Sequence, residues 1–254
     1  MGIKIAICQF GIKWENKEEN IASANIFIRE AAKNQADIIL FPEMSFTGFS
    51  MNIEITKEVN EFSIKKMKES AIKEGIAIGF GWVKAIGNQA ENHYSIIDSQ
   101  GCVISDYVKM HSFGYGGEKE QFIEGNEIKT FIFKDFSFTP FICYDLRFPE
   151  IFREAMDKTD IYIVPANWPA SRDNHWKILL QARAVENQAY VLGINCVGQV
   201  GDLYYCGNSC VINPNGMIIQ NTIQREELIY ADIKCEDFSI RESFPVGKDR
   251  KIKK

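Results

Sequence analysis

The chain has 254 residues, of which 46% are hydrophobic and 25% charged, and its formal net charge at pH 7 is −5. This is the composition of an ordinary globular protein, long enough for one large α/β domain or two small ones. The negative balance gives no reason to expect nucleic-acid binding, and no apolar run is long enough to cross a membrane. The seven cysteines lie scattered, mostly in apolar runs, which favours a reducing cytoplasm over a disulfide framework.

Predicted strands and helices alternate in the first part of the chain. Residues 4–10 read as a strand, without the cleavage site of a signal peptide, and residues 16–34 as an amphipathic helix. Residues 37–41 are continuously apolar, as expected of a strand buried on both faces. A second helix is predicted at 57–74 and a glycine-rich strand at 76–83. This alternation predicts a sheet covered by helices.

Hairpins dominate the middle and the end of the chain. Paired strands are predicted at 94–98 with 103–109 and at 128–133 with 136–142, separated by a glycine-rich loop at 112–126. The remaining predicted elements are a short helix from Pro149, a strand at 161–164, a helix at 173–188 and strands at 191–195, 208–213, 216–220 and 228–233. These strands outnumber what one open sheet holds comfortably, so two stacked sheets are expected.

No linker, low-complexity segment or internal repeat divides the chain, so a single domain of mixed α/β class is predicted over residues 1–254. Residues 248–254 are basic, and we expect them to form a flexible, solvated tail. Cys206 and Cys210 have no matching second pair, so no zinc site is predicted.

Cys143 stands where an apolar, β-prone run gives out, shortly before a helix that begins at Pro149. A side chain at the carboxyl end of a central strand faces the crevice in which α/β proteins tend to bind ligands. The next residue, Tyr144, offers a backbone N–H of the kind that holds an oxyanion, and a thiol beside such a donor is a candidate nucleophile. The alternative is a core cysteine, because free cysteines are among the most buried residue types.

Two further polar residues end predicted strands. Glu43 follows the buried strand, where a carboxylate can act as a general base, and Lys109 ends the strand at 103–109. The alternatives are a glutamate on an exposed loop and a lysine on a solvated strand edge. An ammonium favours the thiolate, and a carboxylate can carry its proton to a leaving group. Together with Cys143, these residues make a complete set for acyl transfer.

Three histidines offer a competing site, a Cys–His pair with Cys143. They are His93, His111 and His175. His111 lies two residues after Lys109, and we expect it to line the same pocket in a structural or substrate-binding role. His175 starts a predicted helix just after Asp173, where it is expected to pack or cap.

Three segments resemble the signature blocks of the nitrilase, or carbon–nitrogen hydrolase, superfamily and occur in its order. They are FPEM at 41–44, YVKMH at 107–111 and CYDLRFPE at 143–150. The resemblance runs from the first strand to about Phe244. It implies a four-layer α-β-β-α sandwich and a homodimer.

The same resemblance implies a catalytic triad of Glu43, Lys109 and Cys143. Glu118 matches a second glutamate that is typical of the loop after the lysine. The implied reaction is amide hydrolysis through a thioester on Cys143, with the oxyanion held by Lys109 and the backbone N–H of Tyr144. No metal or organic cofactor is required for it.

Residues 165–172 (PANWPASR), 175–176 (HW) and 182–190 (ARAVENQAY) resemble the bacterial omega-amidase branch of this superfamily. That branch removes the terminal amide of 2-oxo acid amides such as 2-oxoglutaramate. Such a substrate also carries a carboxylate, so the resemblance implies a cation in the pocket.

Arg172 is the first candidate for that cation and Arg147 the second, because a planar guanidinium suits a carboxylate bidentately. For Arg147 the alternative is an ion pair with Asp145 or Glu150. Three aromatic side chains are candidate walls of the pocket, or else part of the core: Phe46, Tyr115 and Trp168.

Two other functions stay open at this point. The nearest is another amidase of the same superfamily, acting on N-carbamoyl amino acids or on a deaminated peptide. The other is a non-catalytic binding module on the same scaffold. The intact set of Glu43, Lys109 and Cys143 argues against a binding module.

Overall fold

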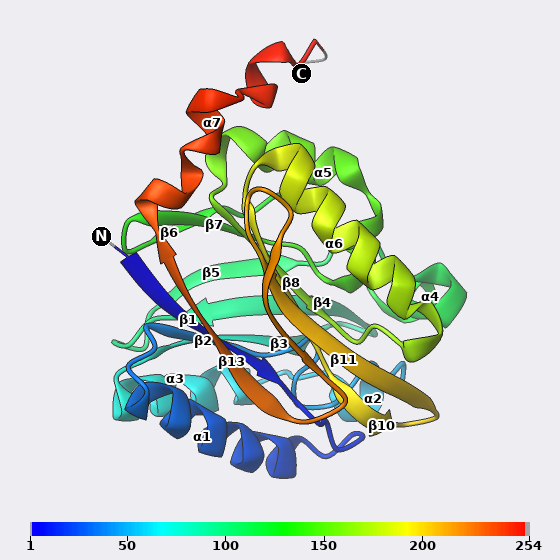
Figure 1. Ribbon diagram of the computed structural model, residues 1–254. Helices are drawn as coiled ribbons and strands as arrows, with labels where there is room; N and C mark the ends of the chain where they lie inside the picture. The colour runs from blue at the N-terminus through cyan, green and yellow to red at the C-terminus, as the bar shows by residue number, and fades with distance from the viewer. Residues whose placement is uncertain (1, 252–254) are drawn as a thin grey trace.

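Two stacked β-sheets, each with helices on its outer face, form the protein in the computed structural model, which describes residues 2–251 (Figure 1). Helices α1 (Lys17–Lys33) and α3 (Phe62–Glu74) cover one sheet, and α5 (Pro149–Ala155) and α6 (Asp173–Asn187) cover the other. The predicted four-layer α-β-β-α sandwich is therefore confirmed.

The first sheet has the strand order β13-β1-β2-β3-β4-β5. Its strands are β1 (Gly2–Gln9), β2 (Ile38–Leu40), β3 (Ala77–Ile86), β4 (Gln89–Ile97), β5 (Val103–Val108) and β13 (Glu227–Lys234). Strands β1, β2 and β3 run parallel because α1 and α3 connect them, and the other pairs are antiparallel. Helix α1 starts at Asn16, whose side chain accepts a hydrogen bond from the backbone N–H of Glu19, and it buries Ile21, Ala24 and Ile28.

The second sheet has the order β10-β11-β9-β8-β7-β6, and β12 pairs with β11. Its strands are β6 (Phe131–Phe133), β7 (Phe136–Pro140), β8 (Ile161–Ala166), β9 (Tyr190–Asn195), β10 (Val197–Val200), β11 (Leu203–Ile212) and β12 (Ile218–Ile223). Strands β7, β8 and β9 are parallel, with α5 and α6 as their crossovers. Their carboxyl ends therefore meet at one edge of the sheet.

Aromatic side chains fill the space between the sheets near the carboxyl ends of the strands. Tyr107 of β5 and Phe141, just after β7, pack edge to face with ring centroids 5.8 Å apart. Phe141 also contacts Phe152 of α5, with a centroid distance of 4.5 Å. These contacts hold the carboxyl ends of strands from both sheets against each other.

Short helical segments complete the chain. They are α2 (Ile53–Thr56), α4 (Glu118–Gln121), α7 (Ile240–Ser243) and the 3₁₀ turns η1 (Gly114–Gly116), η2 (Cys143–Arg147), η3 (Met156–Lys158), η4 (Ala170–Arg172), η5 (Cys235–Phe238) and η6 (Val246–Asp249). Figure 1 shows the C-terminal segment leaving β13 and passing beyond the sheets on the side of α5.

Several boundaries differ from the sequence prediction. Helix α3 begins at Phe62 instead of residue 57, because the backbone N–H of Glu58 donates to the Val83 carbonyl of β3. The Glu58 side chain then caps the helix by accepting hydrogen bonds from the N–H and the hydroxyl of Ser63. Strand β4 begins at Gln89, five residues earlier than predicted, since Gly87 takes the left-handed conformation that a tight hairpin with β3 requires. Strand β10 was not predicted, and β11 starts five residues earlier than predicted.

The predicted flexible tail also differs in its first part. Residues 246–249 form the turn η6, and the Arg250 guanidinium donates to the Arg153 carbonyl at 2.8 Å and to Asp157 Oδ2 at 2.7 Å. Residues 252–254 lie outside the described part of the chain.

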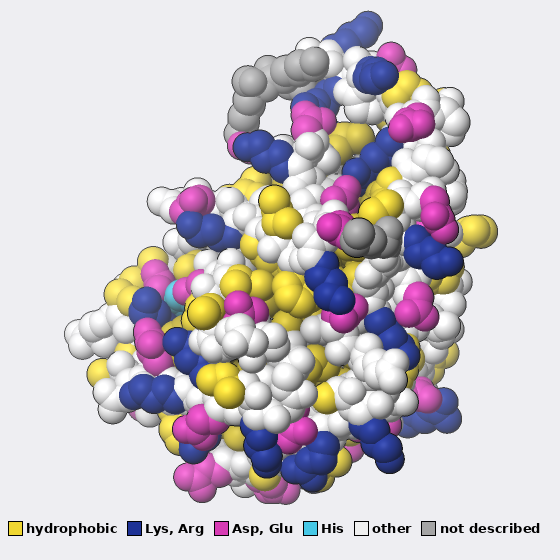
Figure 2. All heavy atoms as spheres, turned by 90° about the vertical axis from the view of Figure 1, so that its left-hand side faces the viewer, with side chains coloured by type: hydrophobic (Ala, Val, Ile, Leu, Met, Phe, Trp, Pro, Cys, Tyr) yellow, Lys and Arg dark blue, Asp and Glu magenta, His cyan; other side chains and the backbone are white. Residues whose placement is uncertain are grey.

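The face of the molecule that is drawn in Figure 2 carries charges of both signs. Figure 2 shows acidic and basic side chains interspersed along the lower rim of that face, and neither sign forms a continuous field there. Within residues 2–251, no helix has both the length and the apolar character that a membrane span needs.

Candidate active site

Four polar residues follow strand ends at one edge of the two sheets. Glu43 comes after β2, Lys109 directly after β5, Cys143 after β7 and Asn167 directly after β8. The local sequence fixes the first of them through Gly81 of β3. A Cβ at Gly81 would lie only 2.2 Å from the Met44 backbone nitrogen, so only glycine lets the Glu43 loop lie this close to β3.

Glu43, Lys109 and Glu118 form a buried ion cluster. The Lys109 ammonium lies 2.8 Å from Glu43 Oε1 and 2.9 Å and 3.0 Å from the two carboxylate oxygens of Glu118. Burial alone would lower the pKa of Lys109, but the charges of Glu118 and Glu43 outweigh it and raise that pKa above its ordinary value. The ammonium therefore stays protonated, as an oxyanion-binding group must.

Glu118 has a different balance of the same effects. Burial raises the pKa of its carboxyl group, the Lys109 ammonium lowers it and the Glu43 carboxylate raises it again, with a net rise above the ordinary value. Its Oε2 also accepts the backbone N–H of Phe113 at 2.6 Å. Glu118 thus ties the ammonium to the loop that carries Phe113.

Asn92 of β4 completes this cluster, and the sequence analysis missed it. Its Nδ2 donates to Glu43 Oε1 at 2.9 Å and to Glu118 Oε1 at 3.1 Å, and its backbone carbonyl accepts the N–H of Lys109. The predicted strand began at residue 94. Extending the strand two residues back would have placed Asn92 on the same buried face as Tyr94, because side chains alternate along a strand.

The Glu43 carboxylate is also held from the opposite sheet. Glu43 Oε2 accepts a hydrogen bond from the backbone N–H of Asn167 at 2.9 Å, and the backbone carbonyl of Glu43 accepts one from Asn167 Nδ2 at 2.7 Å. Donors from Lys109, Asn92 and Asn167 therefore fix both carboxylate oxygens beside the cysteine. A carboxylate held this way is preorganised to exchange a proton with a neighbouring group.

Cys143 sits on a strained turn at the start of η2. Its φ is +46°, in the left-handed region that non-glycine residues rarely adopt, and its Sγ lies 4.0 Å from the Asn167 carbonyl oxygen. Burial raises the pKa of the thiol, the negative charge of Glu43 raises it further and the Lys109 ammonium opposes them only in part. From the sequence, Lys109 was expected to favour the thiolate, whereas in the structure the pKa of Cys143 is raised, so the resting group is a thiol that needs a base.

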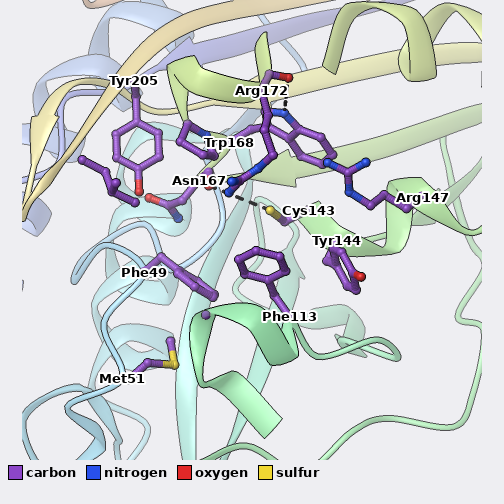
Figure 3. A pocket seen from close by; sticks show the side chains of 13 residues that line it. Phe49, Met51, Phe113, Cys143, Tyr144, Arg147, Asn167, Trp168, Arg172 and Tyr205 are labelled. Atoms are coloured by element: carbon purple, nitrogen blue, oxygen red, sulfur yellow. Dashed lines mark hydrogen bonds between the residues drawn. The ribbon is translucent and has the colours of Figure 1, made fainter. Parts of the chain in front are cut away.

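The thiol opens into a cavity of about 210 Å³ (Figure 3). Aromatic and aliphatic side chains line most of it: Phe49, Met51, Phe113, Trp168, Leu203 and Tyr205. Asn167, Tyr144 and two arginines supply its polar atoms. A cavity of this kind suits a small ligand with an apolar body and a charged end.

Both candidate arginines line this cavity. The Arg147 guanidinium lies 4.8 Å from the Trp168 ring centroid and its Nη2 lies 3.3 Å from His175 Nδ1, while the Arg172 guanidinium lies 5.3 Å from the Phe113 ring centroid. Along the described chain neither has a carboxylate partner, so the ion pair considered for Arg147 is not formed. Two cations stacked on aromatic rings are thus available to an anionic ligand.

Residues 4–239 match the family described as carbon–nitrogen hydrolase. The chain belongs to this family. A 2-oxoglutaramate amidase of Bacillus subtilis (strain 168) is 34% identical to it over 250 residues, covering 96% of each chain.

Two further proteins are similar to this carbon–nitrogen hydrolase. A protein of Yersinia enterocolitica named omega-amidase YafV is 31% identical over 250 residues, which is 97% of this chain and 96% of that protein. The crystal structure of XC1258 from Xanthomonas campestris, described as a CN-hydrolase superfamily protein with an arsenic adduct in the active site, is 26% identical. It superposes with a TM-score of 0.94 and covers 100% of this chain and 99% of that one.

Three residues that were predicted to line the pocket of the carbon–nitrogen hydrolase lie outside the cavity lining. Phe46 is buried in the core beneath the first sheet, against Phe80 at a centroid distance of 5.7 Å. Tyr115 is 93% exposed, because it occupies the outer position of the glycine-rich turn η1. His111 turns away from the cavity and contacts Asp145.

The histidines of this hydrolase have other partners than the thiol. His93 Nδ1 and Nε2 contact Asp106 and Glu91, and His175 is exposed beside Arg147. Among the described hydrogen bonds none joins an imidazole to Cys143. The geometry thus favours the acid–amine–thiol set over a Cys–His pair.

Proposed function

We propose that this carbon–nitrogen hydrolase removes the terminal amide of a small 2-oxo dicarboxylic acid monoamide, such as 2-oxoglutaramate, and releases ammonia. The observation that carries the proposal is the cavity that places the Cys143 thiol together with two guanidinium groups that lack carboxylate partners. The names of the two bacterial relatives, an oxoglutaramate amidase and an omega-amidase, support this substrate class.

In the proposed acylation step, Glu43 takes the thiol proton while Cys143 Sγ attacks the amide carbon. The oxyanion is held by the Lys109 ammonium and by the backbone N–H of Tyr144, and one such donor is typically worth about 3 kcal/mol. Glu43 then gives the proton to the departing nitrogen. Ammonia leaves and a thioester remains on Cys143.

In the proposed deacylation step, Glu43 accepts a proton from a water molecule that attacks the thioester carbon. The C–S bond breaks, the acid is released and the proton returns to Cys143. Glu118 keeps Lys109 in place through two short contacts, so it is assigned a positioning role. The scheme uses no metal or organic cofactor.

The substrate carboxylate is assigned first to Arg172 and second to Arg147. Each guanidinium group already lies over an aromatic ring, which restricts its side chain and reduces the entropy that is lost when it binds an anion. Trp168 supplies one of these rings, and its indole N–H donates to the Arg172 carbonyl at 2.8 Å. Trp168 therefore connects the two arginines within the cavity wall.

Ammonia release from a panel of amides tests the proposed function. We expect 2-oxoglutaramate to be turned over with a kcat/KM at least about 100-fold above those of N-carbamoyl amino acids and simple nitriles, and above that of a deaminated peptide, whose hydrolysis is followed through the amine that it releases because it yields no ammonia. We expect Cys143→Ala to be folded and inactive on all of them. Preferred turnover of an N-carbamoyl compound would move the enzyme to the rival class, and no turnover of any member would favour a binding module.

We further propose, from the family resemblance, a homodimer located in the cytoplasm, without a nucleic-acid or membrane partner. Sedimentation at micromolar concentration tests the first part, with a mass of twice the chain expected. A monomer under those conditions would contradict it.

A further inference from the structure

Asp145 lies two residues after Cys143, is fully buried and is absent from the cavity lining. Its two carboxylate oxygens accept four hydrogen bonds that come from two different segments of the chain. We propose that Asp145 is a positioning residue that holds the segment of Lys109 and the turn of Cys143 in their reactive arrangement. This inference rests on the proposed function, in which both groups act on the same carbonyl.

The first segment bound by Asp145 is the one that carries Lys109. Tyr107 and His111 flank the lysine by two residues on either side. Tyr107 Oη donates to Asp145 Oδ2 at 2.8 Å, and the His111 backbone N–H donates to Oδ1 at 2.9 Å. His111 Nδ1 lies 2.8 Å from the same oxygen and carries the proton, because a carboxylate can only accept. Strand β5 ends at Val108, so these bonds hold the chain beyond the strand.

The second segment is the turn that carries the thiol. Ile142 and Asp145 exchange two hydrogen bonds, from the Asp145 N–H to the Ile142 carbonyl at 3.0 Å and from the Ile142 N–H to Asp145 Oδ2 at 2.9 Å. Cys143 lies between them with its positive φ, a conformation that persists only where the surroundings over-determine it. The ring of Phe148 stacks on the His111 imidazole with centroids 3.8 Å apart, which joins the end of the turn to the lysine segment again.

The donors on Asp145 are arranged so that an amide cannot replace the carboxylate. Burial raises the pKa of Tyr107 and the charge of Asp145 raises it further, so the phenol remains a donor. The backbone N–H groups of Ile142 and His111 point at different oxygens. An asparagine would turn its NH₂ group toward one of these N–H groups and lose at least one bond.

The test is Asp145→Asn, measured on 2-oxoglutaramate. We expect kcat to fall about 100-fold, the typical cost of displacing reacting groups by about 1 Å. We expect KM to change less than about threefold, because Asp145 touches no part of the cavity. Because a loss of folded protein would also lower the apparent kcat without changing KM, kcat is expressed per folded molecule, with the folded fraction measured by circular dichroism.

Asp160→Asn is the matched control. Asp160 precedes β8 at the opposite end of the strand. It accepts hydrogen bonds from the Ser137 N–H at 3.0 Å and hydroxyl at 2.7 Å and pairs with Arg241 at 2.7 Å. The Asp160→Asn variant therefore loses a similar number of contacts, far from the cavity. We expect its kcat to stay within about twofold at a temperature where circular dichroism shows both variants folded.

Tyr107→Phe serves as a second variant, because it deletes one of the four bonds and adds no polar group. We expect its kcat to fall about fivefold with KM unchanged. The proposal is overturned if Asp145→Asn and Tyr107→Phe keep kcat within about twofold, or if the loss falls on KM. Turnover by Cys143→Ala would instead count against the proposed function, so the two failures are distinguishable.

Discussion

The surroundings of the Cys143 thiol have two parts that differ in how their charges are partnered. We call them the charged wall, the buried cluster of Glu43, Asn92, Lys109 and Glu118 that lies outside the cavity lining, and the arginine wall, formed in the lining by Arg147, Arg172 and the rings beneath them. In the charged wall every ionised group is buried and bonded to another member. In the arginine wall, within the described residues, the guanidinium groups contact rings, an imidazole and no carboxylate.

Under the proposed mechanism, this difference separates chemistry from recognition. The groups proposed to act on the reacting atoms are fixed in advance, so no reorganisation is needed during the reaction. The cations proposed to bind a substrate carboxylate keep their charge free for it, since an internal partner would have to be displaced first. Substitutions in the two walls should therefore change different kinetic constants.

The largest effect is expected in the charged wall, from Glu43→Gln. Loss of the general base should lower kcat about 10³- to 10⁴-fold. The same change should speed alkylation of Cys143 by iodoacetamide, because the negative charge of Glu43 raises the pKa of the thiol and its removal favours the thiolate.

Mass spectrometry of the Cys143 peptide measures that alkylation, and the exposed Cys102 is an internal control whose rate should not change. Hydrolysis and alkylation should thus move in opposite directions. Slower alkylation of Cys143 in Glu43→Gln would contradict the assigned electrostatics.

The next largest effect is expected from Lys109→Met. It leaves two buried carboxylates without their cation, so we expect a loss of about 3–5 kcal/mol in the free energy of unfolding and a kcat about 10²- to 10³-fold lower. Lys134→Met is the control, because Lys134 pairs with Asp37 on the surface with 44% of its side chain exposed. Its cost should be below about 1 kcal/mol. Equal destabilisation in urea melts of the two variants would disprove a special role for the buried cluster.

A smaller effect, on a different constant, is expected from Arg172→Ala. We expect KM for 2-oxoglutaramate to rise about 50-fold, the value of a charge-assisted bidentate contact, with kcat little changed. For a neutral amide of the same length KM should change less than about threefold. An equal rise on both amides would assign Arg172 to the structure of the wall instead of the carboxylate.

The smallest effect is expected from Arg147→Ala, about tenfold in KM for 2-oxoglutaramate. Arg147 shares its Nη2 with His175, so less of its guanidinium group is free to bind an anion than in Arg172. A larger rise in KM for Arg147→Ala than for Arg172→Ala would reverse the order of the two arginines.

The sequence predicted the ionised members of both walls, and for the charged wall the reason is geometric. Glu43, Lys109 and Cys143 each follow a strand, and strand ends at one edge of stacked sheets converge whatever the loops do. The sequence did not predict Asn92 as a site residue, because strand β4 starts earlier than its β-prone core suggests. The partner of Asn92 across the sheet, Val83, lies near the hairpin turn.

Loop side chains were harder to place from the sequence. Phe46 and Tyr115 belong to loops, where no periodicity tells which way a ring points, and the structure places one in the core and the other in solvent. Trp168 lines the cavity because Asn195 holds its backbone, its N–H donating to Asn195 Oδ1 at 2.8 Å. That contact joins the segment after β8 to the end of β9, and neither segment alone predicts it.

Acid quenching of the enzyme during turnover of 2-oxoglutaramate, followed by mass spectrometry of the peptide that contains Cys143, tests the thioester most directly. The mechanism predicts that this cysteine carries the acyl group of the substrate, and that the adduct disappears when the substrate is exhausted. An unmodified Cys143 at every quench time, together with ammonia release by Cys143→Ala at the unsubstituted rate, would contradict it.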